Sequence, residues 1–241
     1  MTRKVAVIIG ANGAIGKSTS KRILKAGIDV VLVDKQLIEW STSLTNAEPI
    51  VADISTWDGL ALIEDVVKTR HKNIDYLINC AGINIRKPIA QYTWEDWDTI
   101  LDVNLKSAFF IMQAMSKLMT PNGGKIVNVS SIQGSTCWNA NGAFSLAPYC
   151  ASKAGLIAIS KAFALDLAKD NITVNTVSPG FVDTDLINPL KDNEDYYNDI
   201  LRHTPLGRLA TVDEVSDAIM FLIGNDYVTG HDLLIDGGWT I

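Results

Sequence analysis

The chain has few cysteines. Its three, Cys80, Cys137 and Cys150, are odd in number and are not spaced like the paired ligands of metal sites. A framework of disulfide bonds and a cysteine-based metal centre are therefore not expected, and we predict no metal. Cysteines without disulfide partners are typical of a reducing compartment, so the predicted location is the cytoplasm.

Long apolar runs are also missing. No window reaches the roughly 18 consecutive apolar residues that a membrane span requires. The first apolar run, at 5–9, is shorter than the core of a signal peptide, and no cleavage site follows it. The net charge of −6 supplies no excess of positive charge to attract nucleic acid or an anionic membrane. Neither kind of partner is expected.

No linker rich in proline, glycine or serine, no low-complexity tract and no repeat divides the 241 residues. The content of 47% apolar and 20% charged residues is that of a globular protein with a sizeable core, and we predict one domain over 1–241. The segment 185–208 differs because it is polar, acidic and contains prolines. Long irregular segments in compact chains are often functional, so we expect a substrate-binding loop or lid there.

Short β-branched apolar runs alternate with segments of helical periodicity. The runs expected to form strands are 5–9, 30–33, 76–79, 125–130, 172–177 and 231–236. The segments expected to form helices are 15–26, 57–70, 94–119, 151–169 and 213–222. Near-continuous apolar character indicates parallel strands buried on both faces, and the alternation indicates repeated βαβ units. The predicted fold class is therefore α/β, a doubly wound parallel sheet with helices on both faces.

The first predicted strand leads directly into GANGAIG, with glycines at 10, 13 and 16. Such a turn lets the backbone approach a pyrophosphate, and the next helix offers free N–H groups to the phosphates. A tight turn without a ligand is the alternative. Asp34 ends the second predicted strand, where a carboxylate can bind the adenosine ribose and repel a 2′-phosphate, or merely start a turn. We expect NAD, with NADP less favoured, although Lys17 and Lys35 lie nearby in the sequence.

Tyr149 and Lys153 lie four residues apart in APYCASKAG. Residues at this spacing share one face of a helix, so the pair is compatible both with an ordinary helix surface and with a proton-transfer device. Ser131 follows a predicted strand, at the carboxyl edge of the sheet where open α/β folds place their sites. The spacing alone does not decide between the two alternatives.

Taken together, the motifs resemble those of the short-chain dehydrogenase/reductase (SDR) family. In chain order they are GANGAIG, Asp53-Ile54, NCAG at 79–82, Asn104, Ser131, YCASK at 149–153 and SPGFVDT at 178–184, followed by a similar C-terminal part. The resemblance covers essentially the whole chain. It implies a single Rossmann-type domain with a parallel sheet of about seven strands, and assembly into a homo-oligomer, a homotetramer or a dimer.

The resemblance assigns the chemistry to Asn104, Ser131, Tyr149 and Lys153. Tyr149 would be the general acid/base. Because a tyrosine is a poor base at its ordinary pKa of about 10, the ammonium of Lys153 would stabilise the phenolate, and it would also hydrogen-bond the nicotinamide ribose. Ser131, preferred to Ser130, would bind the substrate oxygen, and Asn104 would hold a water in the proton relay. Each of these residues alone also has a purely structural interpretation.

The same resemblance implies a cofactor-binding set drawn from several parts of the chain. The expected residues are Gly10, Asn12, Ala14, Ile15, Gly16, Asp34, Asp53, Ile54, Asn79, Ala81, Gly82, Tyr149, Lys153, Pro179, Gly180, Val182 and Thr184. Of these, Asp53 and Ile54 would receive the adenine, and the segment after Ser178 would meet the nicotinamide carboxamide. The proline–glycine pair also has a plain turn interpretation.

The stretch between Ser131 and Tyr149 is several residues longer than is usual in the family. The added residues fall in QGSTCWNANGAFSLAP, which would border the substrate pocket, so Trp138, Asn139, Asn141 and Phe144 are candidates for substrate contact. A surface excursion with a buried aromatic anchor is the alternative. Further candidates for an anionic or sugar-like substrate are Asn84, Arg86, Lys87, Arg202 and His203. The predicted substrate-binding set is Ser131, Tyr149, Asn84, Arg86 and Trp138.

These residues predict an NAD(H)-dependent oxidoreductase. It would interconvert a secondary alcohol and a ketone, such as a polyol, a sugar derivative or a 3-oxoacyl compound, by proton transfer through tyrosine and lysine and by hydride transfer. A non-catalytic dinucleotide-binding regulatory or assembly protein is the alternative, which the presence of both Tyr149 and Lys153 disfavours. An enoyl reductase is expected to space its tyrosine and lysine more widely than four residues.

Overall fold

The protein, described here by a computed structural model over residues 3–119, 121, 123–139 and 142–241, is built on one parallel sheet. Seven strands lie in the order β3-β2-β1-β4-β5-β6-β7. Their bounds are β1 Val5–Ile9, β2 Asp29–Asp34, β3 Ala47–Val51, β4 Tyr76–Asn79, β5 Gly124–Val129, β6 Ile172–Pro179 and β7 Asp232–Ile235. In the register, Ile8 lies between Leu32 of β2 and Ile78 of β4. The predicted doubly wound parallel sheet is confirmed.

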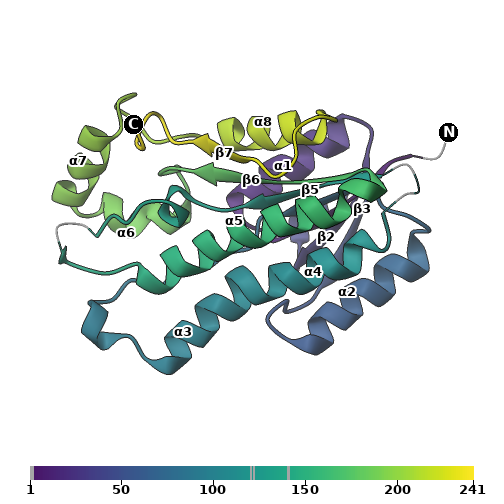
Figure 1. Ribbon diagram of the computed structural model, residues 1–241, viewed down its shortest axis with the longest axis horizontal. Coiled ribbons are helices and arrows are strands. Elements are labelled where there is room, and N and C mark those ends of the chain that lie inside the picture. The colour runs from purple at the N-terminus through teal and green to yellow at the C-terminus, as the bar shows by residue number, and fades with distance from the viewer. Residues whose placement is uncertain (1–2, 120, 122, 140–141) are drawn as a thin grey trace.

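The helices cover both faces of the sheet (Figure 1). Their bounds are α1 Ala14–Lys25, α2 Trp57–Arg70, α3 Trp94–Leu101, α4 Ser107–Ser116, α5 Ala147–Leu167, α6 Asn188–Lys191, α7 Glu194–His203 and α8 Val212–Ile223. Successive side chains of a strand point to opposite faces of the sheet, so the core has one part on each face. Val7 and Ile9 of β1 pack with residues of α2, α4 and α5, whereas Ala6 and Ile8 pack with residues of α1 and α8. Within the described residues, no helix is both long and apolar enough to cross a membrane.

Strand β3 was not among the strands predicted from the sequence. Its sequence, AEPIV, is short and contains a proline, and only Ile50 among its residues is buried. Pro49 is tolerated because β3 is an edge strand, paired on one side with β2 alone. The other six strands differ from the predicted ranges by no more than two residues at either end.

The prediction of one continuous helix over 94–119 was wrong. The chain instead forms α3, then a π-helical turn over Asp102–Lys106, and then α4. Apolar residues continue through the whole segment, so the periodicity gave no sign of the break. The π-helical turn carries Asn104, which is buried, and π-helical turns are frequent at functional sites.

Helix α5 begins earlier than predicted, at Ala147 instead of Ala151. Pro148 occupies the first turn, where a residue without an N–H group is tolerated. Both Tyr149 and Lys153 therefore lie on the helix, one turn apart. This placement satisfies the geometrical condition for a tyrosine–lysine pair on one helical face.

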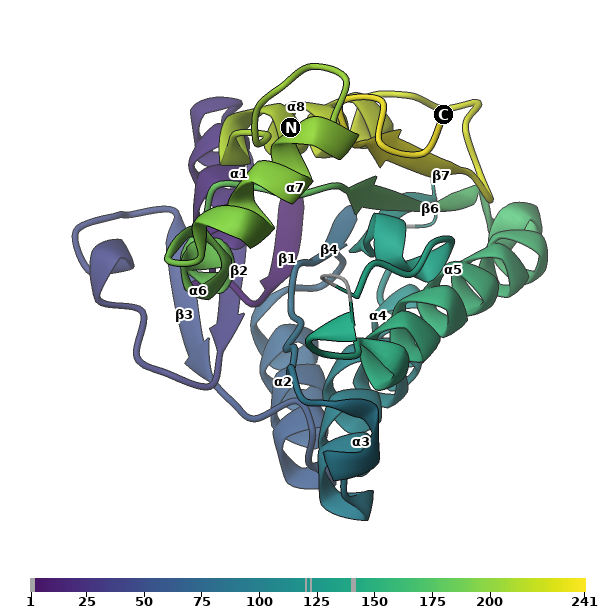
Figure 2. The same cartoon turned by 90° about the vertical axis from the view of Figure 1, so that its left-hand side faces the viewer.

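The segment 185–208, expected to be a loop or lid, is largely helical. It contains a 3-10 turn at Asp185–Ile187, then α6 and α7. Ile187, Leu190 and Ile200 form a small apolar cluster of their own, against which Trp138 and Trp239 pack. Figure 2 faces the end of the molecule at which α6 and α7 lie, in front of the strands.

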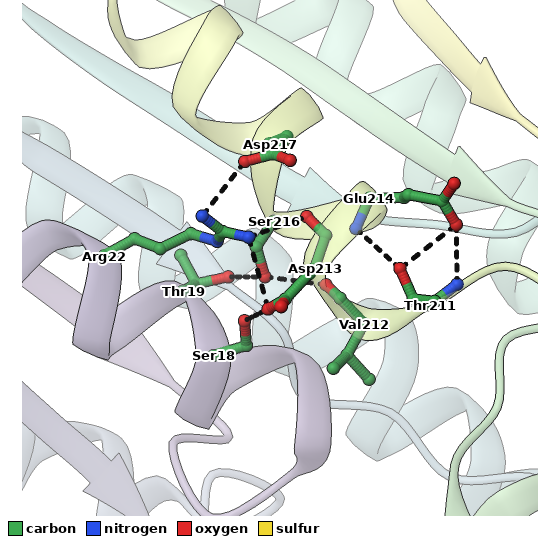
Figure 3. Close-up of polar contacts among 9 residues, drawn as sticks. All are labelled: Ser18, Thr19, Arg22, Thr211, Val212, Asp213, Glu214, Ser216 and Asp217. Atoms are coloured by element: carbon green, nitrogen blue, oxygen red, sulfur yellow. Dashed lines mark hydrogen bonds and ion pairs between the residues drawn. The ribbon is translucent and has the colours of Figure 1, made fainter.

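Helices α1 and α8 are joined by polar contacts (Figure 3). Ser18 donates to Asp213 at 2.7 Å, and Thr19 donates to Ser216 at 3.1 Å. Arg22 pairs with Asp213 at 3.2 Å and with Asp217 at 3.1 Å. Thr211 and Glu214 cap the start of α8 reciprocally. Since α1 starts at the glycine-rich turn, these contacts fix the direction in which its N-terminus points.

Candidate active site

The glycine-rich turn is closed by contacts that exclude side chains. Gly10 has φ +75°, and a Cβ there would lie 2.8 Å from the backbone nitrogen of Ala81. At Gly16 a Cβ would lie 2.2 Å from the carbonyl oxygen of Gly10. Helix α1 begins at Ala14, within this turn and before Gly16, so the free N–H groups of its first residues lie at the turn. The geometry is that of a backbone cradle for phosphate groups.

Asp34 and Asn12 are linked at the end of β2. The Asp34 carboxylate accepts hydrogen bonds from the backbone N–H groups of Asn12 at 3.0 Å and Gln36 at 3.1 Å. The side-chain amide of Asn12 in turn donates to the carbonyl oxygens of Gln36 and Leu37. The negative charge of Asp34 is thus held next to the glycine-rich turn.

The next predicted cofactor residues follow β3 and lie at the end of β4. Asp53 accepts hydrogen bonds from the backbone N–H and hydroxyl of Ser55, which hold the pKa of its carboxyl below the ordinary value. Ile54 packs into the apolar core. The side chain of Asn79 accepts a hydrogen bond from the N–H of Ala81 at 3.2 Å and so shapes the end of β4.

Ser131, Tyr149 and Lys153 come together at the carboxyl end of β5. Tyr149 and Ser131 are joined by a side-chain hydrogen bond. The Lys153 ammonium lies 5.7 Å from the centroid of the Tyr149 ring and donates to the carbonyl oxygen of Val129 at 2.9 Å. Gly82 lies against this ammonium, since a Cβ there would come within 3.1 Å of its nitrogen.

Burial and neighbouring charges set the proton affinities of these groups. Burial lowers the pKa of Lys153 to about 8. Burial raises the pKa of Tyr149, whereas the hydrogen bond with Ser131 and the positive charge of Arg86 lower it. The cation whose charge lowers the pKa of the phenol in this structure is Arg86, which was predicted to contact the substrate.

Asn104 lies outside the pocket wall and supports it. Its side-chain oxygen Oδ1 accepts a hydrogen bond from the backbone N–H of Ile83 at 2.8 Å. Its side-chain nitrogen Nδ2 donates to the backbone carbonyl oxygen of Ile83 at 2.9 Å and to the Ser152 hydroxyl at 3.0 Å. The π-helical turn thus ties the segment after β4 to the helix that carries Tyr149 and Lys153.

One pocket brings many of the predicted residues together. Its described lining includes Ile15, Gly82, Asn84, Arg86, Ser131, Trp138, Tyr149, Lys153, Pro179, Gly180, Val182 and Thr184. It does not include Gly10, Asn12, Ala14, Gly16, Asp34, Asp53, Ile54, Asn79, Ala81 or Asn104. The pocket therefore joins the predicted proton-transfer group to the predicted nicotinamide end. Apart from Ile15 and Gly82, the residues predicted for the adenosine and the pyrophosphate lie outside it.

Other candidates for substrate contact have partners elsewhere. Lys87 pairs with Asp96 at 2.7 Å, and both Arg202 and His203 contact Asp199. The longer stretch between Ser131 and Tyr149 is anchored by Trp138 as the sequence allowed. Phe144 packs edge-on against Trp138, and the Asn139 side chain accepts the N–H of Gly142. Asn141 lies outside the described residues.

Several residues of the pocket were not predicted from the sequence. Both Gln133 and Cys80 line it. The other missed side chains are mainly apolar and include Leu146, Phe181, Leu186, Ile187 and Leu190. The place of Gln133 in the sequence, two positions after Ser131, was the one available signal.

Comparison with known proteins gives matches over the whole chain. The protein family described as Enoyl-(Acyl carrier protein) reductase matches residues 10–240. The 2-dehydro-3-deoxy-D-gluconate 5-dehydrogenase of Escherichia coli (strain K12) is 32% identical over 98% of this chain and 95% of that protein. The 3-oxoacyl-[acyl-carrier-protein] reductase FabG of Thermotoga maritima is 35% identical over 99% of this chain and 98% of that protein. A solved structure of a gluconate 5-dehydrogenase from Burkholderia cenocepacia J2315, in complex with NADP and tartrate, has a TM-score of 0.91 and 29% identity, covering 100% of this chain and 96% of that one.

Proposed function

The chain belongs to the short-chain dehydrogenase/reductase family, and we propose that it is an NAD-dependent oxidoreductase acting on a small hydroxy or oxo acid. Relatives in this family interconvert CH–OH and keto groups. The observation that carries the proposal is the pocket in which Ser131 and Tyr149 meet two cationic side chains, Arg86 and Lys153. We further propose that 1–241 is one catalytic domain and that 185–208 forms the lid of this pocket.

The glycine-rich turn fits a dinucleotide because its backbone leaves no room for side chains at Gly10 and Gly16. In this proposal the turn and the N-terminus of α1 hold the pyrophosphate, Asp34 binds the adenosine ribose, and Lys153 binds the nicotinamide ribose. When bound, the nicotinamide accepts or supplies the hydride. The Asp34 carboxylate next to Asn12 supports a preference for NAD, since it would repel a 2′-phosphate.

The proton moves through Tyr149. In alcohol oxidation the phenolate accepts the hydroxyl proton of the substrate as the carbon loses its hydride, and in ketone reduction the phenol returns that proton to the oxygen. Ser131 donates a hydrogen bond to the substrate oxygen and stabilises the charge that develops there. The positive charges of Arg86 and Lys153 favour the phenolate form.

The charge of the pocket supports an acid as substrate. Among the described residues that line it, two are cationic and none is acidic. Arg86 donates to the carbonyl oxygen of Leu186 at 3.2 Å, yet its buried Nε has no hydrogen-bond partner among the described atoms. A substrate carboxylate would accept a hydrogen bond from this Nε and would balance the excess of positive charge in the pocket. Three of the relatives carry names of sugar-acid dehydrogenases, which agrees with this substrate class.

A substrate screen tests the proposal. Purified protein should reduce NAD⁺ with at least one sugar acid or other hydroxy acid, and it should do so faster than with the neutral alditol of the same chain length. 3-Oxoacyl thioesters belong in the same screen, because relatives such as FabG of Thermotoga maritima are named for them. Absence of turnover with every alcohol and ketone would favour the non-catalytic alternative. Turnover confined to enoyl thioesters would overturn the assignment of Tyr149.

Replacing Asp34 tests the cofactor preference. In Asp34→Ala the repulsion of a 2′-phosphate is lost, and the N–H groups of Asn12 and Gln36 become free to bind that phosphate. The ratio of kcat/KM for NAD⁺ to that for NADP⁺ is expected to fall by about tenfold or more. Asp53→Ala is the matched control, since its loss should weaken both cofactors alike. An unchanged ratio in Asp34→Ala would refute the assigned role.

We also propose that the protein is a homo-oligomer, a dimer or tetramer, in the cytoplasm. A row of edge-on ring contacts runs across α2, α4 and α5, formed in order by Trp57, Phe110, Phe109 and Phe163. Trp57 is 73% exposed and Leu165 on α5 is 82% exposed. An apolar surface of this kind supports self-association. Light scattering is expected to give a mass that is a multiple of the monomer mass and that Leu165→Asp lowers; a monomer at all concentrations would contradict the proposal.

A further inference from the structure

Gln133 is a buried polar residue of the pocket that the proton-transfer chemistry does not use. It lies in the 3-10 turn Ile132–Gly134 directly after Ser131, and it is only 5% exposed. The hydroxyl of Ser131 accepts the backbone N–H of Gln133 at 3.2 Å, so the two residues are fixed relative to each other. The side chain of Gln133 lines the same pocket as Ser131 and Tyr149.

Two donors determine the orientation of the Gln133 amide. Its Oε1 accepts the backbone N–H of Trp138 at 3.0 Å and faces the Cys150 thiol at 3.7 Å. Burial raises the pKa of Cys150 to about 12, so the thiol is protonated and can donate. An amide nitrogen in this place would face two donors, and the oxygen must therefore point there. The amide nitrogen Nε2 consequently points elsewhere.

The Nε2 group is buried and has no hydrogen-bond partner among the described atoms. A buried donor without an acceptor is unfavourable in a folded protein, and such a group in a pocket points to a ligand. Two other polar atoms of the pocket lining, Arg86 Nε and Asn84 Oδ1, share this property. We propose that Gln133 is a substrate-binding residue, whose Nε2 donates to a hydroxyl, carbonyl or carboxylate oxygen near the reacting carbon, and that Asp199 positions it through Trp138.

Asp199 acts from the lid. It lies on α7, is 5% exposed, and accepts the indole N–H of Trp138 at 2.8 Å. Arg202 and His203 of the same helix also contact its carboxylate. The Trp138 ring is further held edge-on by Phe181, with centroids 5.3 Å apart. The indole hydrogen bond thus fixes Trp138, and the backbone N–H of Trp138 fixes the Gln133 amide. The lid and the longer stretch after Ser131 therefore both orient the Nε2 donor of Gln133.

The first test removes the donor of Gln133. Since the inference rests on the proposed function, kinetics are measured with the best hydroxy acid of the substrate screen. Gln133→Met, which keeps the length of the side chain, is expected to raise the substrate KM by about tenfold to a hundredfold, with kcat within about threefold of the wild type. The KM for NAD⁺ should not change. Gln91→Leu, at an exposed position outside the pocket lining, is the matched control.

Gln133→Glu is a second, nearly isosteric variant that keeps the acceptor and replaces the donor by a carboxylate. It is expected to weaken binding of an acid at least as much as Gln133→Met, and it keeps the test open if Gln133→Met does not fold. An unchanged substrate KM in a folded variant of an active enzyme would overturn the inference and leave the proposed function intact. An inactive wild type would instead contradict the proposed function.

The positioning role is tested by a double-mutant cycle. Trp138→Phe keeps the ring but removes the indole donor, and Asp199→Leu removes its acceptor. Each of these two substitutions alone should raise the substrate KM severalfold. When either is combined with Gln133→Met, the increase in KM should be smaller than the product of the two separate increases. Asp199→Asn keeps an acceptor oxygen and should restore most of the affinity. Additive effects, or an Asp199→Asn protein as weak as Asp199→Leu, would contradict positioning through Trp138.

Discussion

Tyr149→Phe is expected to lower kcat by about a thousandfold, because a general acid/base contributes on this order and phenylalanine carries no transferable proton. Because phenylalanine keeps the ring of Tyr149, removal of the hydroxyl should leave the packing of α5 intact. Steady-state rates with a hydroxy acid and NAD⁺ measure the loss. Binding of NADH, followed by its fluorescence, should be nearly unchanged.

The matched control for this variant is Tyr227→Phe. Tyr227 is fully exposed near the C-terminal part and lies outside the pocket lining, so the loss of its hydroxyl should not change the rate. A Tyr149→Phe protein that turned over at nearly the wild-type rate would show that another group transfers the proton. The proposed mechanism would then be wrong, although the family and the fold would stand.

Arg86→Leu is expected to lower kcat/KM for hydroxy acids by about a hundredfold, since it removes a charge-assisted hydrogen bond at a half-buried site. For a neutral alcohol the loss should be much smaller. Lys87→Leu is the matched control, because Lys87 is the neighbouring cation but pairs with Asp96. Equal losses for acids and neutral alcohols in Arg86→Leu would refute recognition of the substrate charge.

The same variant should shift the pH dependence of alcohol oxidation. The positive charge of Arg86 lowers the pKa of Tyr149 by favouring the phenolate, so removing that charge raises this pKa. Because oxidation requires the deprotonated tyrosine, the rising limb of kcat/KM against pH should move to higher pH in Arg86→Leu. A limb that stayed at the wild-type pH would mean that Arg86 does not act on the phenol.

Much of the fold could be predicted because its main signals are local. Buried parallel strands read as short apolar runs, and the glycine-rich turn needs glycine where a Cβ would collide with backbone, as at Gly10 and Gly16. Edge strand β3 gave no such signal, since an edge strand with Pro49 is only partly buried. The break between α3 and α4 was also invisible, because it depends on the hydrogen bonds that Asn104 makes to Ile83 across the fold.

In the candidate site, too, residues with a local sequence signal could be predicted, whereas residues defined by tertiary contacts could not. Tyr149, Lys153 and Ser131 could be named from motif and spacing, and the structure brings them to one pocket. Gln133 could not, because its free donor is defined only by Trp138 and Cys150, which approach it in the folded chain. Likewise, Arg86 and Tyr149 meet in the pocket only in the folded chain, and no spacing in the sequence reports it.

We propose that this site oxidises the alcohol of a small acid, with Arg86 binding the carboxylate and Tyr149 transferring the proton. The most direct test is the ratio of kcat/KM for a sugar acid to that for the alditol in which its carboxylate is a CH₂OH group. We expect the wild-type ratio to be about a hundredfold in favour of the acid, and to fall close to one in Arg86→Leu. A wild-type ratio near or below one would contradict the account.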